Sequence, residues 1–127
     1  MMYNTYSNKF GKGIGYMKST HDILLEFTGQ VKRILGKNLK KVILYGSYAR
    51  GDYRENSDID IMILTTLTDE EIWKTKTSIY DLAFDFQMEY GVDISVVIKN
   101  EEHFNYWLGV LPFYDNVQKE GVVLSEW

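Results

Sequence analysis

The sequence predicts one α/β (α+β) domain in which helices pack on a small mixed β-sheet. Two long segments carry apolar residues every three or four positions, which is the period of a half-buried helix. Between and after them lie short apolar runs with the length and alternation of strands. The chain has 127 residues, 45% of them hydrophobic and 25% charged, so it can build one packed core without disulfide or metal cross-links.

The first helix is expected to begin at Ser19 or Thr20, because either hydroxyl can cap the free N–H groups of a helix start. Gly36 is expected to end it, since glycine readily adopts a left-handed conformation. Residues 1–18 have little apolar periodicity and are predicted to be a flexible tail before a domain over 19–127. The apolar face of the helix comprises Ile23, Leu24, Phe27, Val31, Ile34 and Leu35.

The next segments alternate between strand and helix patterns. Residues 41–45 predict a short buried strand, and residues 46–51 predict a tight turn with a short helix. A second strand is predicted beyond them, because every other residue there is an isoleucine. Its residues are Asp58, Ile59, Asp60, Ile61, Met62 and Ile63.

A second long helix is predicted to begin after Thr68, because Thr68 and Glu71 form a capping box, and to end at Gly91. Helices on one side of the sheet would bury the apolar stripes, and we expect that arrangement. The remaining elements are a third strand over 92–98, helices over 101–107 and 111–119, and an extended piece over 121–124.

Composition excludes several classes of function. The chain has no cysteine, so it can form neither a disulfide framework nor a thiolate metal site. No stretch approaches the ~20 apolar residues that span a membrane, and no secretory signal is seen, which fits a cytoplasmic protein. The formal net charge of −4 argues against tight nucleic-acid binding, but it permits a nucleotide substrate whose charge is balanced by Mg²⁺.

The first candidate site feature is the turn at Gly46 and Ser47, between a predicted strand and a short helix. N–H groups at a helix start attract phosphate oxygens, and glycine lets a phosphate approach the main chain. The Ser47 hydroxyl adds one neutral donor. Taken alone, the same pattern also fits an ordinary turn with a serine cap.

The second feature is the pair Asp58 and Asp60, two residues apart on a predicted strand. Their side chains would leave the same face of the strand, with Cα atoms ~6.6 Å apart. Aspartate is disfavoured in strands and like charges repel, so a strand that carries both usually has a cation between them. A solvated strand end with an Asx turn would give the same pattern.

The third feature is Asp93, at the start of the third predicted strand. If this strand neighbours the strand of Asp58, three carboxylates converge, and two Mg²⁺ ions with a triphosphate need about that many anionic ligands. Considered alone, Asp93 also fits an exposed residue at a strand start. The three features together are far more specific than any one of them.

The runs GSYARG (46–51) and SDID (57–60) resemble the nucleotidyltransferase superfamily to which DNA polymerase beta belongs. The resemblance extends over about residues 20–125 and is strongest to the minimal prokaryotic branch, the MNT proteins. It implies a nucleotidyltransferase fold with a mixed-sheet core. It also implies an enzyme that moves a nucleoside monophosphate, most simply AMP from ATP, onto an acceptor hydroxyl and releases pyrophosphate.

The resemblance assigns a role to each candidate residue. Asp58 and Asp60 would ligate Mg²⁺, and Asp93 would ligate one metal ion and help to deprotonate the acceptor. Gly46 and Ser47 would contact the β- and γ-phosphates of the nucleotide. Arg50 would either contact a phosphate or form a structural ion pair, with Asp52 or Glu55 as partner. All three acidic positions are filled, so the sequence gives no sign of an inactive site.

The resemblance also implies a partner. MNT proteins often accompany a small helical HEPN protein as a toxin–antitoxin pair, in which the MNT protein resembles an antitoxin that adenylylates a tyrosine of the HEPN ribonuclease. Homo- or hetero-oligomers are compatible with this. Two alternatives remain: transfer to a small molecule, as in aminoglycoside nucleotidyltransferases, and a non-catalytic module that neutralises its partner by contact alone.

Overall fold

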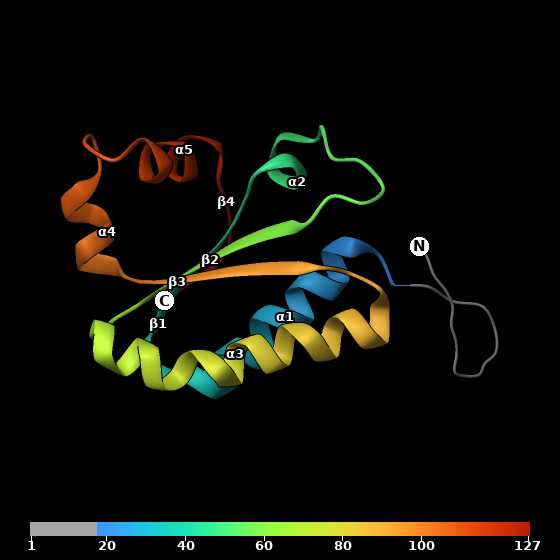
Figure 1. Ribbon diagram of the computed structural model, residues 1–127, viewed down its shortest axis with the longest axis horizontal. Coiled ribbons are helices and arrows are strands. Elements are labelled where there is room, and N and C mark those ends of the chain that lie inside the picture. Colours follow the sequence, from blue (N-terminus) through green and yellow to red (C-terminus); the bar gives the residue numbers. More distant parts are fainter. Residues whose placement is uncertain (1–17) are drawn as a thin grey trace.

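A four-stranded sheet separates two layers of helices in the computed structural model, which describes residues 18–127 (Figure 1). The strand order is β3-β2-β1-β4, and β1 is antiparallel to both β2 and β4, whereas β2 and β3 are parallel. The predicted small mixed sheet is therefore confirmed. The strands are β1 (Leu39–Tyr45), β2 (Ile59–Thr65), β3 (Ile94–Asn100) and β4 (Val122–Glu126).

The predicted tail over residues 1–18 lies almost wholly outside the described residues and stays a prediction. Only Lys18 of this segment is described. Its ammonium group forms an ion pair with Glu26 and lies 3.3 Å from the hydroxyl oxygen of Tyr90.

The ends of the two long helices lie where the sequence predicts them. The Ser19 hydroxyl accepts a hydrogen bond from the N–H of Asp22 and so caps α1 (Thr20–Leu35). Thr68 and Glu71 form the predicted capping box at the start of α3 (Asp69–Tyr90). The glycines that follow the two helices, Gly36 and Gly91, have φ angles of 58° and 71°. Residues other than glycine rarely adopt such angles.

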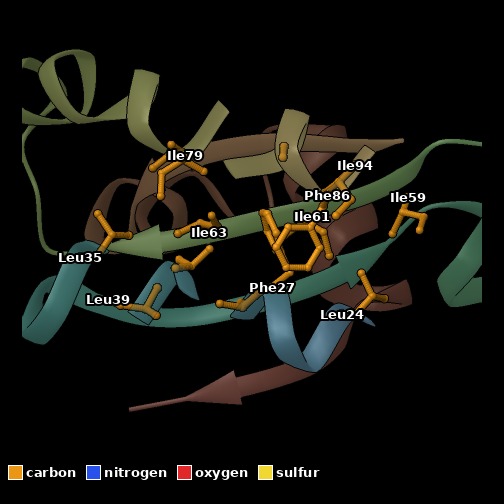
Figure 2. Close-up of a cluster of buried hydrophobic side chains, with 14 of the residues drawn as sticks. Leu24, Phe27, Leu35, Leu39, Ile59, Ile61, Ile63, Ile79, Phe86 and Ile94 are labelled. Atoms are coloured by element: carbon orange, nitrogen blue, oxygen red, sulfur yellow. The ribbon is translucent and has the colours of Figure 1, made fainter. Parts of the chain in front are cut away.

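The first core lies between the sheet and the helices α1 and α3, which lie along the same side of the sheet in Figure 1. Phe27 is at its centre, fully buried, and meets Phe86 edge to face with ring centroids 5.3 Å apart. Figure 2 shows these rings from α1 and α3 against the isoleucines of β2. The isoleucine positions that the sequence assigns to the buried face are Ile59, Ile61 and Ile63.

A second core lies on the opposite face of the sheet, so the prediction of helices on one side only is wrong. Helices α4 (Glu101–Trp107) and α5 (Pro112–Glu120) cover that face. The reason lies in the strands, which carry apolar side chains on both faces once the polar end of β2 is passed. The residues of this core are Ile43, Met62, Leu64, Phe104, Tyr114 and Val117.

The connections complete the described fold. A single 3₁₀ turn (Gly36–Asn38) joins α1 to β1, and a four-residue helix, α2 (Ser47–Arg50), follows β1. Within residues 18–127, no helix combines the length and apolarity that crossing a bilayer requires.

Replacing Phe27 with alanine is expected to lower the free energy of unfolding by about 3–5 kcal/mol, because the change leaves a cavity in the first core. Urea unfolding followed by circular dichroism measures this. Tyr106→Ala is the matched control, since that aromatic side chain is 75% exposed and its removal should cost less than about 0.5 kcal/mol. Equal losses in the two variants would contradict the placement of Phe27.

Candidate active site

The acidic pair of β2 points away from the first core. Side chains alternate along a strand, and the isoleucines of β2 belong to the first core, so Asp58 and Asp60 project from the sheet face that α4 and α5 partly cover. Asp60 is half-buried, whereas Asp58, directly before the strand, is exposed. The shared face that the sequence predicts for the two carboxylates is therefore present.

Asp93 lies beside this pair because β2 and β3 are parallel neighbours. Ile59 is opposite Ile94 in the register. The residues that precede them, Asp58 and Asp93, therefore lie at the same level of the sheet. The N–H of Ile59 donates to the carbonyl oxygen of Asp93 at 2.8 Å, which fixes the two strand starts together. β3 begins at Ile94 rather than at residue 92, so Asp93 precedes the strand instead of starting it.

Asp58 is close enough to Asp60 and to Asp93 to affect the ionisation of both. Burial raises the pKa of Asp60, and the negative charge of Asp58 raises it further, while Arg50 opposes the shift. Burial also raises the pKa of Asp93, and Asp58 adds to the shift by its charge and as a hydrogen-bond partner. Ionised together, the three groups repel one another, and a cation between them would relieve the repulsion.

The donor set suits Mg²⁺, which prefers carboxylate and other hard oxygen ligands. Among residues 18–127, no three acidic or histidine side chains form a ready-made metal cage. Mg²⁺ rarely uses such a cage: it usually keeps several waters and binds one or two carboxylates together with substrate phosphates. Carboxylates near the starts of two neighbouring strands, exposed at Asp58 and Asp93 and half-buried at Asp60, fit that mode of binding.

The Gly46-Ser47 turn lies directly against Asp60. Tyr45 is opposite Asp60 in the β1–β2 register, so Gly46 follows at the same end of the sheet. Its φ is 73°, and a Cβ there would lie 2.3 Å from Oδ2 of Asp60. Only glycine fits both the conformation and the space. No side chain caps α2, whose first N–H groups, like those of any helix, lack an intrahelical acceptor and suit phosphate oxygens.

Arg50 forms ion pairs in this structure. Its Nε lies 3.1 Å from a carboxylate oxygen of Asp52, and its Nη1 lies 3.1 Å from a carboxylate oxygen of Glu120. Of the two partners that the sequence suggested, Asp52 is engaged, and the second partner is Glu120 rather than Glu55. The guanidinium is still close enough to Asp60 to lower the pKa of that carboxyl.

Sequence reasoning missed two residues of this region. Tyr45 shares the sheet face of Asp60, and burial with the nearby charge of Asp60 raises the pKa of its hydroxyl to about 12. The alternation of side chains along β1 could have predicted this position, because Tyr45 lies two residues after Ile43 and so on the same face. Glu120 reaches Arg50 across 70 positions of sequence, and no local pattern signals such a contact.

A hollow of about 310 Å³ lies between the start of α1, the segment that follows β1, and β4. The rings of Tyr48 and Tyr53 stack at its edge, with centroids 4.1 Å apart and planes 5° from parallel. Its lining includes Leu44, whose side chain packs on the first core. This hollow and the carboxylates therefore use opposite faces of the sheet.

Residues 24–124 match the model of the nucleotidyltransferase domain family. The chain belongs to this family. Two Methanocaldococcus jannaschii proteins named "putative protein adenylyltransferase" are similar to it. One is 39% identical over 99 residues, which cover 78% of this chain and 91% of the relative; the other is 40% identical over 77 residues, which cover 61% and 76%. The resemblance to nucleotidyltransferases, and with it the prediction of an enzyme of that class, is confirmed.

Solved structures of this nucleotidyltransferase fold are also similar. A "putative nucleotidyltransferase" of Sulfolobus solfataricus is 24% identical, with 93% of both chains covered and a TM-score of 0.54. A toxin–antitoxin complex with AMP-PNP contains a chain that is 22% identical, with 86% of this chain and 75% of that chain covered and a TM-score of 0.52. These likenesses confirm the predicted fold.

Gly46→Ala is expected to lower the free energy of unfolding by about 1–3 kcal/mol, because alanine is strained at this backbone conformation and its methyl group meets Asp60. Urea unfolding measures the change. Gly29→Ala is the control: it lies in α1 with nothing within 4 Å of the added Cβ, and it should gain about 0.5–1 kcal/mol. A Gly46→Ala protein as stable as the native one would refute the tight turn.

Asp58→Asn is expected to stabilise the metal-free protein at neutral pH, because it removes the charge that raises the pKa of Asp60 and Asp93. The sign follows from the raised pKa: the folded state holds its protons longer than the unfolded state, so stability falls as pH rises through the ordinary aspartate pKa of about 3.9 towards the raised folded values. The stability gap between the variant and the native protein should therefore be small in acid and open as the acids ionise.

Thermal unfolding of both proteins across this pH range, with EDTA present, measures the gap. Asp69→Asn is the control, because Asp69 opens α3 beyond the other end of β2 and should show no such pH-dependent gain. A gap independent of pH would mean that the three carboxylates do not interact as described.

Proposed function

We propose that this nucleotidyltransferase transfers AMP from ATP to a hydroxyl group of a partner protein. The observation that carries the proposal is the placement of the acids: Asp60 lies against the Gly46-Ser47 turn, and Asp58, on the same strand end, is level with Asp93 on the neighbouring strand. A triphosphate that is seated on that turn would extend its charged oxygens along this acidic end of the sheet, and bound Mg²⁺ would neutralise charge on the phosphates and on the leaving group.

Each residue has a distinct task in the proposed reaction. The amide groups at Gly46 and Ser47 would hold the β- and γ-phosphates, and Asp58 and Asp60 would hold the Mg²⁺ that neutralises their charge. Asp93, whose raised pKa suits a proton acceptor, accepts the proton of the acceptor hydroxyl. Arg50, beside Asp60, keeps its two ion pairs and thereby fixes the segment that follows the turn.

The chemical step is an in-line displacement at phosphorus. The acceptor oxygen forms a bond to the α-phosphorus, the bond from this phosphorus to the bridging oxygen breaks, and pyrophosphate leaves. The proton of the hydroxyl passes to Asp93. No protein nucleophile takes part, so most of the rate comes from positioning and from charge complementarity.

A protein-borne acceptor fits the openness of the site. Asp58 and Asp93 are both exposed, so a side chain carried by another protein can reach them without entering a deep cleft. The names of the similar Methanocaldococcus proteins support protein adenylylation, and the similar solved structure bound to an ATP analogue is a toxin–antitoxin complex. We therefore propose an antitoxin that adenylylates a tyrosine of a helical, HEPN-type toxin.

Asp58→Asn is expected to reduce AMP transfer by at least about a hundredfold, since it removes a charged metal ligand from the transition state. The assay follows label from α-³²P-ATP with Mg²⁺ into a co-expressed helical partner, and mass spectrometry locates AMP on tyrosine. Asp69→Asn is again the matched control and should transfer at the native rate.

Other outcomes would separate the alternatives. Full activity of Asp58→Asn would refute the catalytic role of the acidic cluster. Label that enters an aminoglycoside, but never a protein, would show a small-molecule enzyme. A partner that is neutralised without AMP, equally well by the native and Asp58→Asn proteins, would show neutralisation by contact alone.

A further inference from the structure

Helix α3 carries a second apolar face that the fold does not use. Its buried face, with Ile79, Ala83 and Phe86, packs on the first core. A separate row of side chains runs along the outside of the helix, which lies at the edge of the molecule in Figure 1. We call it the α3 stripe: Trp73 (68% exposed), Thr77, Tyr80 (46%), Phe84 (59%) and Met88 (70%).

The spacing of the α3 stripe is that of a helix–helix seam. Its residues lie four, three, four and four positions apart, so they fall on one side of the helix over about 22 Å. Large apolar residues in such a row are the knobs that pack against a second helix. Isolated exposed apolar residues are common on protein surfaces, but a continuous row of four turns marks an interaction surface.

Charged residues beside the stripe indicate which helix fits it. Lys74, Asp81 and Asp85 follow one another along the same flank of α3. The midpoint of Lys74 and Asp85 lies within one position of the midpoint of Trp73 and Met88, the two ends of the stripe. An antiparallel copy of α3, centred on the stripe, would therefore place Lys74 of each chain near Asp85 of the other.

Other arrangements fit this surface less well. A parallel pair would set Lys74 and Asp85 each against its own copy, which is repulsive, whereas the antiparallel pair sets only the central Asp81 near its own copy. The acidic flank and the net charge of −4 also disfavour a nucleic acid or an anionic membrane as the occupant. Two-fold symmetry is the commonest arrangement of homo-oligomers, and the placement of Lys74 and Asp85 at similar distances from the centre of the stripe suits it.

We propose that a second copy of this chain binds the α3 stripe and forms an antiparallel α3–α3 dimer. Trp73 of each copy packs against Met88 of the other, a favourable contact between sulfur and an aromatic ring. Lys76, whose ammonium lies 3.6 Å from the centre of the Trp73 ring, shields the end of the seam. The carboxylates project from the opposite face of the sheet, so both copies keep an open site.

Sedimentation equilibrium of the full chain, from micromolar to submillimolar concentration, tests the proposal. The native protein should dimerise, and Phe84→Asp should raise the dissociation constant at least about a hundredfold, because a charge enters the middle of the seam twice. Val110→Asp is the matched control: this apolar residue is 62% exposed but lies outside α3, and its loss should leave the dissociation constant unchanged.

Charge reversal tests the antiparallel pairing itself. Lys74→Glu and Asp85→Lys should each weaken the dimer about tenfold, since each creates two repulsive contacts. The double variant restores opposite charges and should return to within about threefold of the native dissociation constant. Circular dichroism confirms that every variant is folded.

Several results would overturn the proposal. These are a native protein that stays monomeric throughout, a dimer indifferent to Phe84→Asp, or a double variant weaker than either single one. A monomer whose stripe instead binds a helical partner would also overturn it, because that partner would then be the occupant. None of these results depends on AMP transfer, so the dimer and the proposed function can fail separately.

Discussion

The parallel pairing of β2 with β3 determines where every carboxylate of the site stands. Because Ile59 pairs with Ile94, Asp58 lies level with Asp93. The hydrogen bond from the Ile59 amide to the Asp93 carbonyl stabilises this register. A slip by one residue would turn the acidic side chains into the first core and the isoleucines out of it. The same apolar packing that stabilises the sheet therefore also holds mutually repelling charges together.

The antiparallel pairing of β1 with β2 supplies the other half of the site. It brings the turn after Tyr45 against Asp60 so closely that residue 46 has no room for a side chain. The turn that we propose to bind phosphate therefore lies against Asp60 at one end of the sheet, although about ten residues separate the turn from the acidic pair in the chain. Asp69 serves as a control because it opens α3 beyond the other end of β2, away from this arrangement.

Sequence patterns predicted what depends on neighbours in the chain. The caps at Ser19 and Thr68 and the glycine helix ends at Gly36 and Gly91 follow from local hydrogen bonding and backbone freedom. The shared face of the aspartates follows from strand alternation, and the family resemblance gave the fold. In each case the signal lies within a few residues.

Features that depend on distant segments were missed. The second core needs α4 and α5 to cover a sheet face whose β2 end looks polar in sequence, because Met62 lies on the same face as Asp60 and packs in that core. The partner of Arg50 was sought among nearby acids, although Glu120 also satisfies it. Such contacts depend on how the chain returns, and local periodicity carries no information about that.

The position of β4 has a consequence for how the protein folds. β1 is synthesised early, yet its outer edge pairs with β4, the last strand in the chain. Likewise, Arg50 forms an ion pair with Glu120, which ends α5 just before β4. Contacts between segments so far apart form slowly, because a long loop must close first. A ribosome-bound chain that ends before α5 therefore lacks both the partner strand of this sheet edge and the ion pair between Arg50 and Glu120, so the segment after β1 gains its full set of contacts only with the last residues of the chain.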